Sequence, residues 1–287
     1  MITSTQRNTL SAQQADRLFS YRGMLFGLMF IGAVLFSAPT KAQVLGAAQS
    51  FAVLGGSAVN ATGVGSIVNG DVGVSPGASI TGFPASASVT PPFATHITDG
   101  AANNARAATL TLYNFLAAVG GATPILPGLN GQVLGPGTYS TGAALLPVGG
   151  TLTLSGAGQY VIQIASSLTT GVGSNVVLLN GANACNVFWQ VTTLATLDGA
   201  TFPGNVVAQT GVHLGTGAAL TGRALAAAAG DVTMAGGNRV GGCSVAGAAL
   251  LAQLDAANAP TLSEWAMILL GGLLAYFGFA AIKQQER

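Results

Sequence analysis

The sequence predicts a mainly β protein whose body is a β-solenoid, a coil of stacked short strands. The first observation is a repeat: Gly204 and Gly222 each lie between two short apolar runs, with a polar residue directly after the glycine. A third copy surrounds Gly70, far upstream. Such a unit is too short to fold alone but long enough for one turn of a stacked coil. The second observation is that many of the 42 glycines punctuate the apolar runs as turn signals.

The composition limits the class of protein and its partners. Apolar residues make up 50% of the 287 residues and charged residues only 6%, against roughly 25% charged residues in soluble domains. Disorder is excluded, because it needs low hydrophobicity and high net charge. Between residues 43 and 259 there are three arginines, five aspartates and no lysine. A nucleic-acid partner is therefore not expected, because binding needs clustered Lys and Arg.

The N-terminal 42 residues have the pattern of an export signal peptide. Arg17 and Arg22 precede an apolar run over 24–36, and residues 40–42 form an A-x-A-like cleavage site. A transmembrane anchor is the alternative, but this run is shorter than the roughly 20 residues that span a membrane. The stretch before Arg17 is long for a signal, so an internal start such as Met24 is a further alternative.

Residues 43–243 are predicted to form the solenoid. Each candidate strand has about four or five residues, which is short even for the typical range. Successive side chains of a strand point to opposite faces, so Val161 is expected to oppose Tyr160, and the inward member fills the interior. The candidate strands are 51–54, 57–60, 66–68, 71–74, 138–141, 151–155, 160–164, 175–179, 187–191, 205–208, 223–226 and 231–234.

One helix over residues 98–119 interrupts the strands. Gly and Pro nearly vanish there, Thr98 or Asp99 can cap its start, and the two glycines at 120–121 end it. Its apolar stripe is one-sided, so the helix should lie along the coil and cover one of its faces. The stripe consists of Ala105, Ala108, Leu112, Phe115 and Val119.

The C-terminal part carries a second targeting signal. After a patternless, Ala-rich linker over 244–259 comes a short motif, then an uncharged apolar run over 266–282 and a basic tail. This layout resembles the bacterial IPTL-CTERM sorting signal, although Ala259 stands where that family has Ile. The resemblance implies recognition and cleavage by a sorting enzyme, with the helix in the membrane before processing. A plain membrane anchor is the alternative, and both interpretations place the body outside the cytoplasm, in the cell envelope or secreted. The motif is Pro260, Thr261, Leu262, Ser263, Glu264 and Trp265.

Five stretches of the body resemble the ice-binding-like proteins of microbes. They are 70–77 (GDVGVSPG), 80–84 (ITGFP), 135–139 (GPGTY), 184–191 (ACNVFWQV) and 222–226 (GRALA). The likeness covers residues 44–243 in order. It implies an irregular, right-handed β-solenoid of triangular section with one long helix alongside, and coils that are not stacked in chain order. It also implies adsorption to ice through a flat face.

Candidate ice-contact residues lie at two kinds of position. The resemblance implies Thr-Gly-x-Thr or Thr-Ala-x-Asn steps down one face, and the four corresponding steps here are degraded. These steps contain Thr170, Thr201, Thr216 and Asn238. A second ladder joins Thr169, Thr196 and Thr233 and is interrupted by His213. For each threonine the alternative is a strand former on a solvated face, so weak to moderate ice shaping is expected.

The two cysteines, Cys185 and Cys243, are expected to form a disulfide, the default pairing in an exported chain. Two buried free thiols are the alternative. The bridge would close a loop that contributes roughly 4 kcal/mol in the chain-entropy model. It would tie the last coil to the middle of the body.

No cofactor, metal or enzymatic activity is expected. The only histidines, His96 and His213, form no ligand cluster with other residues in the sequence, and a zinc site needs three or four ligands. The scattered charges do not form the acid–base groove of a hydrolase or lyase. The corner residues Asp71, Asn205 and Arg223 are expected to face solvent in turns.

The expected function is therefore adsorption of a monomer to ice. The alternative is a structural or adhesive protein of the cell envelope that keeps the fold and binds polysaccharide or another surface. A continuous threonine ladder on one flat face would favour ice, and a broken or grooved face would favour the alternative.

Overall fold

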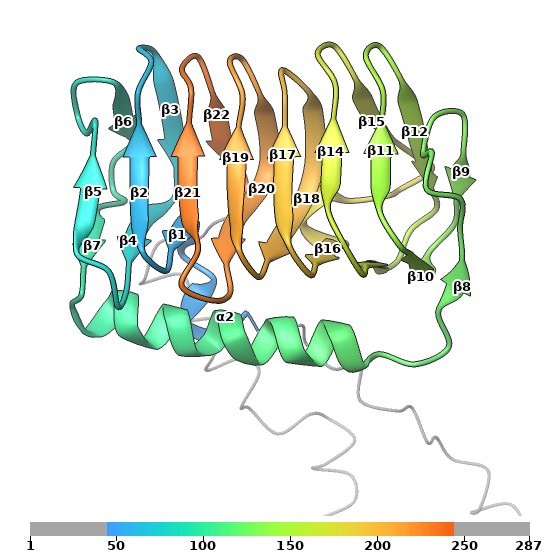
Figure 1. The fold of residues 1–287 in the computed structure, drawn as a ribbon, viewed down its shortest axis with the longest axis horizontal. Coiled ribbons are helices and arrows are strands. Elements are labelled where there is room, and N and C mark those ends of the chain that lie inside the picture. The colour runs from blue at the N-terminus through green and yellow to red at the C-terminus, as the bar shows by residue number, and fades with distance from the viewer. Residues whose placement is uncertain (1–44, 244–287) are drawn as a thin grey trace, which may run out of the picture. The chain divides into compact units, whose positions relative to one another are not determined.

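Residues 45–243 of the computed structural model are described below. They form a mainly β body with parallel sheets and one long helix (Figure 1). The predicted export signal, linker and C-terminal segment fall on residues outside this range. Within residues 45–243, no helix combines the length and the hydropathy that crossing a membrane requires.

The strands stack in three parallel rows, which we call faces A, B and C. Face A runs through β7 (Thr95–Ile97), β4 (Asp71–Val74), β1 (Phe51–Gly55), the second halves of β20 (Ala219–Ala226) and β18 (Thr201–Ala208), β16 (Val187–Val191), β13 (Tyr160–Ile164), β10 (Gly137–Thr141) and β8 (Thr123–Pro124). Face B runs through β6 (Ala87–Val89), β3 (Ser66–Asn69), β22 (Arg239–Gly241), the first halves of β20 and β18, β15 (Asn175–Leu179), β12 (Thr151–Ser155) and β9 (Val133–Leu134). Face C is a seven-stranded sheet of β5 (Ser79–Thr81), β2 (Ala58–Ala61), β21 (Asp231–Met234), β19 (Gly211–Leu214), β17 (Leu194–Leu197), β14 (Leu168–Thr170) and β11 (Ala144–Leu146).

The chain visits the three faces in a fixed order. In each coil it runs along face A, then C, then B, and returns to A across a corner. Gly204 and Gly222 are register partners at this A/B corner, with φ of +120° and +156°, a region that favours glycine. A Cβ on Gly222 would approach the carbonyl oxygen of Gly204 to 1.9 Å. The predicted repeat is therefore confirmed as two stacked corners.

One coil is assembled from both ends of the described chain. The strands β21 and β22 supply its faces C and B, and β1 supplies its face A by pairing with β20 on one side and β4 on the other. Residues 51–97 therefore stack beyond the last strand of the body (Figure 1). The coils are therefore stacked out of chain order, which agrees with what the family resemblance implied.

The interior of the coil is an apolar core built from all three faces. Trp189 of face A packs against Phe202 of face B, with ring centroids 4.6 Å apart. The indole nitrogen of Trp189 donates a hydrogen bond to the carbonyl of Pro203 at 3.0 Å. Within the described residues, the two buried apolar clusters extend from Leu45 to Val240.

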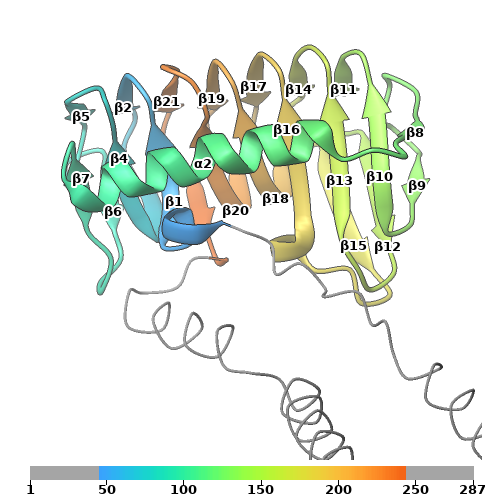
Figure 2. The ribbon, with the colours of Figure 1, turned by 90° about the horizontal axis from the view of Figure 1, so that it is seen from below.

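The helix α2 (Gly100–Ala118) lies along face A (Figure 2). The carboxylate of Asp99 caps its start by accepting a hydrogen bond from the backbone N–H of Ala102 at 2.8 Å. Gln163 of β13 caps its end, because its side-chain amide donates to the carbonyls of Leu116 and Val119, at 2.8 Å each. The predicted helix and its position over one face are confirmed.

The predicted stripe of this helix is right at Ala105 and Leu112 but wrong at Phe115, which is 43% exposed. The buried face is rotated toward Thr109 and Leu116. At 3.6 residues per turn, residues on both sides of the line through Ala105 and Leu112 lie close to the stripe. Packing against face A buries the side with Thr109 and Leu116 and leaves the side with Phe115 exposed. Because the helix covers face A, neighbouring residues of β13 and β16 are buried on both sides of the sheet.

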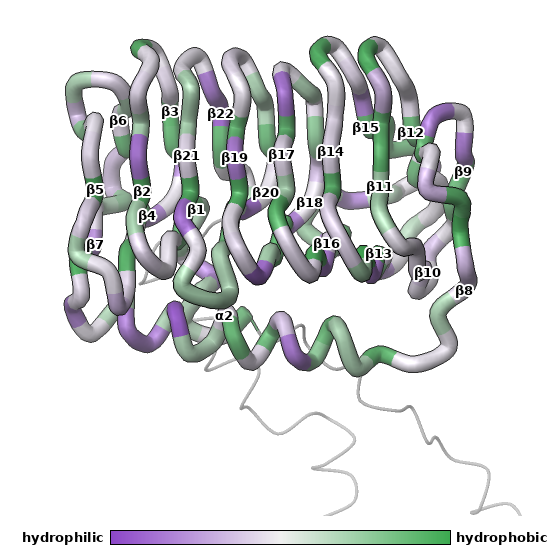
Figure 3. Tube along the Cα trace, viewed as in Figure 1, coloured by the Kyte–Doolittle hydropathy of each residue, from purple (hydrophilic) through white to green (hydrophobic). Residues whose placement is uncertain are grey.

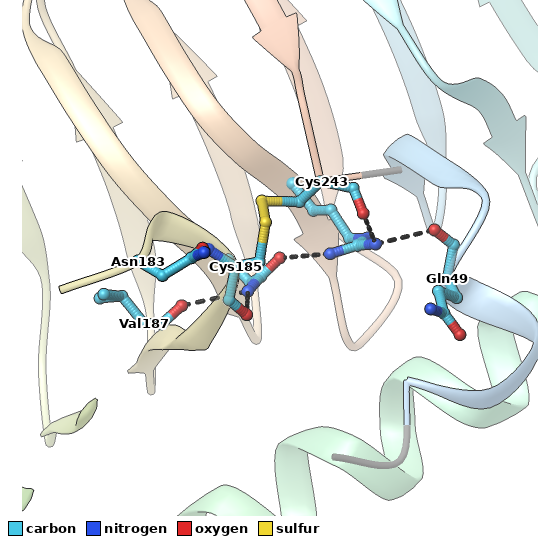
Figure 4. Close-up of a disulfide and its surroundings, with 7 residues drawn as sticks. Gln49, Asn183, Cys185, Val187 and Cys243 are labelled. Carbon is cyan, nitrogen blue, oxygen red and sulfur yellow. Dashed lines mark hydrogen bonds between the residues drawn. A yellow bond between two sulfur atoms is a disulfide. The ribbon is translucent and has the colours of Figure 1, made fainter. Parts of the chain in front are cut away.

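The A/B corner holds a buried arginine, contrary to the prediction that the corner residues face solvent. Arg223 is 1% exposed and Asn205 is 0% exposed, whereas Asp71 is partly exposed. Arg223 donates to the side-chain oxygen of Asn205 at 2.7 Å and to the carbonyls of Gln49, at 2.8 Å, and Cys243 (Figure 4). Both side chains lie on the outer side of face A, the side that Val207 and Leu225 share. They are buried there because the segments at Gln49, Cys185 and Cys243 cover them. Burial lowers the pKa of Arg223 to about 10, so the guanidinium stays charged at neutral pH.

The predicted disulfide is confirmed. Cys185 lies in the short 3-10 helix η2 (Ala184–Asn186) and is bonded to Cys243, 58 positions later (Figure 4). A second 3-10 helix, η1 (Gly46–Ala48), begins the described chain and packs on α2. The bridge thus joins the end of the last coil to the middle of the stack.

Candidate functional site

Face C carries a ladder of outward side chains in register. In six of its strands the ladder residue is flanked by buried residues, so its side chain points away from the core, and Thr81 at the end of β5 is exposed. The ladder lies on a different face of the coil from the one that α2 covers (Figure 1). From one end to the other it consists of Thr81, Asn60, Thr233, His213, Thr196, Thr169 and Leu145.

The strand backbone spaces the ladder evenly. Neighbouring strands in a sheet lie about 4.8 Å apart, so the side chains repeat at that interval. The inward residues beneath them, such as Val59, Val232 and Val212, are fully buried, which holds the strands in place. The hydroxyl of Thr81 donates to the side-chain oxygen of Asn60 at 2.9 Å. Face C is therefore a preordered surface on which small polar side chains predominate, and Figure 3 shows polar and apolar residues alternating along several of its strands.

His213 interrupts the ladder at its centre. Its Nε2 lies 3.3 Å from Oδ1 of Asp231, and both side chains are partly exposed. Asp198 directly follows β17 and lies beside Gly215, which follows β19, so it is at the turn end of these strands. The centre of face C therefore carries a His213–Asp231 pair where the two neighbouring strands carry threonine.

The four degraded steps lie at the turns between faces C and B, and the structure separates their residues. Thr216 is exposed at a turn, and Thr201 is exposed on face B. Thr170 and Asn238 are both 0% exposed, so their prediction as surface contacts is wrong. Thr170 points inward because it directly follows the outward Thr169 in one strand.

Asn238 has a structural role inside its turn. Its side-chain amide donates to the carbonyl of Gly215 at 2.6 Å, and its side-chain oxygen accepts from the backbone N–H of Gly236 at 3.0 Å and the hydroxyl of Ser66 at 3.2 Å. These bonds close the turn and join its coil to the coils on both sides. Its polar groups are therefore satisfied within the body and do not face solvent.

Face B is less regular than face C. One outward column contains Thr151, Asn175, Thr201, Ala219, Arg239, Ile67 and Ser88. It therefore mixes a charged side chain and an exposed isoleucine with small polar residues, and the next outward column is interrupted by the buried Pro203 and Gly241. Among the three faces, C has the most uniform outer surface.

The other histidine anchors the start of the helix. Nδ1 of His96 lies 2.7 Å from Oδ2 of Asp99, and Nε2 lies 3.8 Å from Oδ1 of Asp71. The backbone hydrogen bond from Ala102, and then the bond from His96, lower the pKa of Asp99 below its usual value. Across residues 45–243, no group of three or more His, Cys, Asp or Glu side chains is arranged to hold a metal ion.

Three ladder positions were missed by sequence reasoning. Thr81, Asn60 and Leu145 belong to the same ladder as the four predicted positions. Thr81 and Asn60 precede the helix in sequence and reach face C only because the first coils stack beyond the last one. No local pattern in the sequence indicates that arrangement.

In comparisons with known proteins, the body matches ice-binding proteins. Residues 53–240 match the family model described as "Ice-binding-like", and residues 260–285 match the IPTL-CTERM motif. An ice-binding protein of Nostoc sp. (strain HG1) is 41% identical over 192 residues, which are 64% of this chain and 69% of that protein. Ice-binding protein 1 of Shewanella frigidimarina (strain NCIMB 400) is 33% identical over 218 residues, which are 64% of this chain and 24% of that protein.

Solved structures share the fold. An ice-binding protein from an Antarctic biological consortium superposes with a TM-score of 0.64 at 40% identity, covering 69% of this chain and 90% of that chain. The ice-binding protein of the Antarctic ascomycete Antarctomyces psychrotrophicus gives a TM-score of 0.61 at 34% identity, covering 69% and 96%.

Proposed function

The chain belongs to the ice-binding-like family, and on this premise we propose that it adsorbs to ice through face C. The observation that carries the proposal is the in-register ladder of small polar side chains on the outer surface of face C. The names of the relatives support ice as the ligand. The outer surface of face A is excluded, because the helix α2 packs against it.

The physical basis is a match between two regular surfaces. Ice is an extended lattice, so binding needs a flat and rigid surface rather than a pocket. Each contact is weak, and side chains that are already ordered lose less conformational entropy on binding. A threonine offers a methyl group and a hydroxyl without a charge, so it can hold ordered water beside an apolar contact.

The proposed contact residues are Thr169, Thr196 and Thr233, extended by Asn60 and Thr81 at the far end of the ladder. Thr216, at the edge of faces C and B, forms the border of this surface. Thr201 lies on face B and belongs to the contact surface only if that face also binds.

The interruption of the ladder supports a second candidate. His213 and Asp231 place hydrogen-bonding groups on face C, and such groups suit hydroxylated polysaccharide better than ice. The alternative is an adhesive envelope protein with the same fold. The two candidates predict opposite effects for the replacement of His213 by threonine.

The proposal includes the route of the chain out of the cell. The match of residues 260–285 to the IPTL-CTERM motif supports export and sorting. We place the signal peptide at 1–42, the linker at 244–259 and the sorting segment at 260–287, with Pro260 to Trp265 recognised by a sorting enzyme and the apolar run in the membrane beforehand. Right-handed winding, a triangular section, a monomeric state and the lack of catalysis also belong to the proposal.

The experiment is an ice-affinity partition of residues 43–259, a fragment that contains the whole described core. We compare the natural sequence with Thr196→Tyr on face C and with the matched Thr153→Tyr on face B. We expect the natural protein and Thr153→Tyr to be enriched in ice and Thr196→Tyr to remain in the liquid. Equal enrichment of both variants would reject face C, and exclusion of the natural protein would reject ice binding.

A further inference from the structure

We propose that the A/B corner at Arg223 and Cys243 is the mechanical anchor of the body, through which a chain retained by its C-terminal segment is held while face C adsorbs to ice. The part concerning ice rests on the proposed function, whereas the anchoring role stands on the contacts of the corner. It gives the corner a role in attachment beyond stability of the fold.

The two ends of the body meet at one guanidinium group. Nη2 of Arg223 donates both to the carbonyl of Gln49, just before β1, and to the carbonyl of Cys243, the last described residue. Nη1 of the same group donates to Asn205 of β18. The bonds to Asn205 and Cys243 are buried and the bond to Gln49 is partly buried, and hydrogen bonds to a charged donor are strong in such surroundings. The first stretch, the last stretch and a central strand are therefore held together at one point.

The disulfide provides a covalent path for force into the middle of the stack. Any pull on residues after Cys243 reaches Cys185 through the sulfur–sulfur bond. The side-chain amide of Asn205 donates to the carbonyls of Cys185 and Val187, at 3.1 Å each, which joins that segment to β18. Without the bridge, the same pull would fall on β22, a strand of only three residues.

The position of the corner suits attachment during surface binding. The corner lies between faces A and B, and each coil reaches face C only at its other two edges. Cys243 follows β22 of face B and lies outside every strand of face C. Force applied at the corner therefore crosses the core before it reaches face C, and an attached chain keeps the ladder of face C unobstructed.

The anchoring role is tested by single-molecule pulling, without ice. Residues 43–259 contain no lysine, so one lysine in place of Thr169 gives a handle on face C, with the second handle after residue 259 and the N-terminus blocked. In the variant Cys185→Ser/Cys243→Ser we expect the first rupture at lower force. We also expect stepwise release of up to about 200 Å of chain, from the 58 positions that the bridge encloses.

A second pulling geometry separates anchoring from global stability. Here the handles are the N-terminus and the lysine introduced by Thr169→Lys, so the segment after Cys243 carries no force. We expect the serine variant to match the natural protein in this geometry. An unchanged first rupture force in the C-terminal geometry, or an equal loss of force in both geometries, would overturn the anchoring role.

The part concerning ice has its own measurement. Beads coupled to the protein through residue 259 are offered to a growing ice front, and beads carrying Thr196→Tyr serve as the control. We expect adhesion of the first beads alone. If the free protein partitions into ice but the beads do not adhere, attachment at this corner obstructs face C and that part is overturned. If the free protein fails to partition, the proposed function fails, while the pulling measurements still decide the anchoring role.

Discussion

His213 occupies the place in the face C ladder between Thr196 and Thr233, and its Nε2 lies 3.3 Å from Oδ1 of Asp231. On either side the register continues with threonine or asparagine. A hydrated, titratable side chain at the centre disrupts the uniform spacing that a lattice ligand needs. The pair therefore limits the length of the uninterrupted ladder.

Replacing His213 by threonine should increase ice binding. The change makes the ladder continuous from Thr169 to Thr81, and thermal hysteresis should rise above that of the natural protein. Stability should change by less than about 0.5 kcal/mol, as for most surface substitutions. The matched control is Arg239→Thr, which removes a charged side chain from face B and should leave hysteresis unchanged. If His213→Thr does not raise hysteresis and abolishes binding to polysaccharide, the result would instead favour the adhesive function.

Replacing Thr170 by valine should not weaken the fold. Its buried hydroxyl has no hydrogen-bond partner among the described residues, and an unpaired buried hydroxyl costs free energy. The free energy of unfolding should therefore stay the same or rise by about 1 kcal/mol. The matched control is Thr141→Val, which removes a hydroxyl that donates to the carbonyl of Ala143 at 3.0 Å. Denaturant unfolding that shows equal losses for both variants would contradict this account.

Much of the fold was predictable because its signals are local. The glycine corners, the short strands and the one-sided helix each leave a pattern within a few residues. The corner side chains were not predictable in this way: Asn205 and Arg223 look like polar turn residues, but segments that are distant in sequence cover and bury them. Polarity alone does not reveal that Arg223 finds its acceptors on Gln49 and Cys243, which lie far away in sequence.

The candidate site was predictable only in part for a similar reason. The positions of Thr169, Thr196, His213 and Thr233 come from consecutive coils, so their shared place in each strand could be inferred from the chain. Whether Thr170 or Asn238 faces out depends on one-residue changes of strand register and on turn geometry. A shift by one position reverses the direction of a side chain, and composition does not specify it.

The cap of the helix start should make stability sensitive to acid. The bond from Ala102 and the contact with His96 lower the pKa of Asp99, so the folded state favours the carboxylate. Its contribution is complete above the unfolded aspartate pKa of about 3.9 and is lost as the pH falls through the lower folded pKa. In Asp99→Ala we expect a loss of about 1 kcal/mol at neutral pH and a shallower decline in acid. The control Asp99→Asn keeps an acceptor without titration, so it should retain most of the stability at neutral pH and show the same shallow decline. An unaltered acid profile in both variants would exclude this carboxylate as the cause.

At the C-terminal end of the helix, a negative charge should lower stability, whereas at the N-terminal end it raises stability. The side-chain amide of Gln163 donates to the carbonyls of Leu116 and Val119, which are at the negative end of the helix dipole. Gln163→Glu replaces the donor by a carboxylate facing two acceptors. We expect a loss of about 1–3 kcal/mol at neutral pH, larger than the loss in the control Gln163→Ala. These contacts disfavour the ionised form, so the folded pKa of the new carboxyl is raised and the variant should regain stability as the pH falls through that value. Unfolding curves from pH 7 to pH 4 measure this recovery, and a glutamate variant that stays more stable than the alanine variant at pH 7 would show that the amide does not cap the helix.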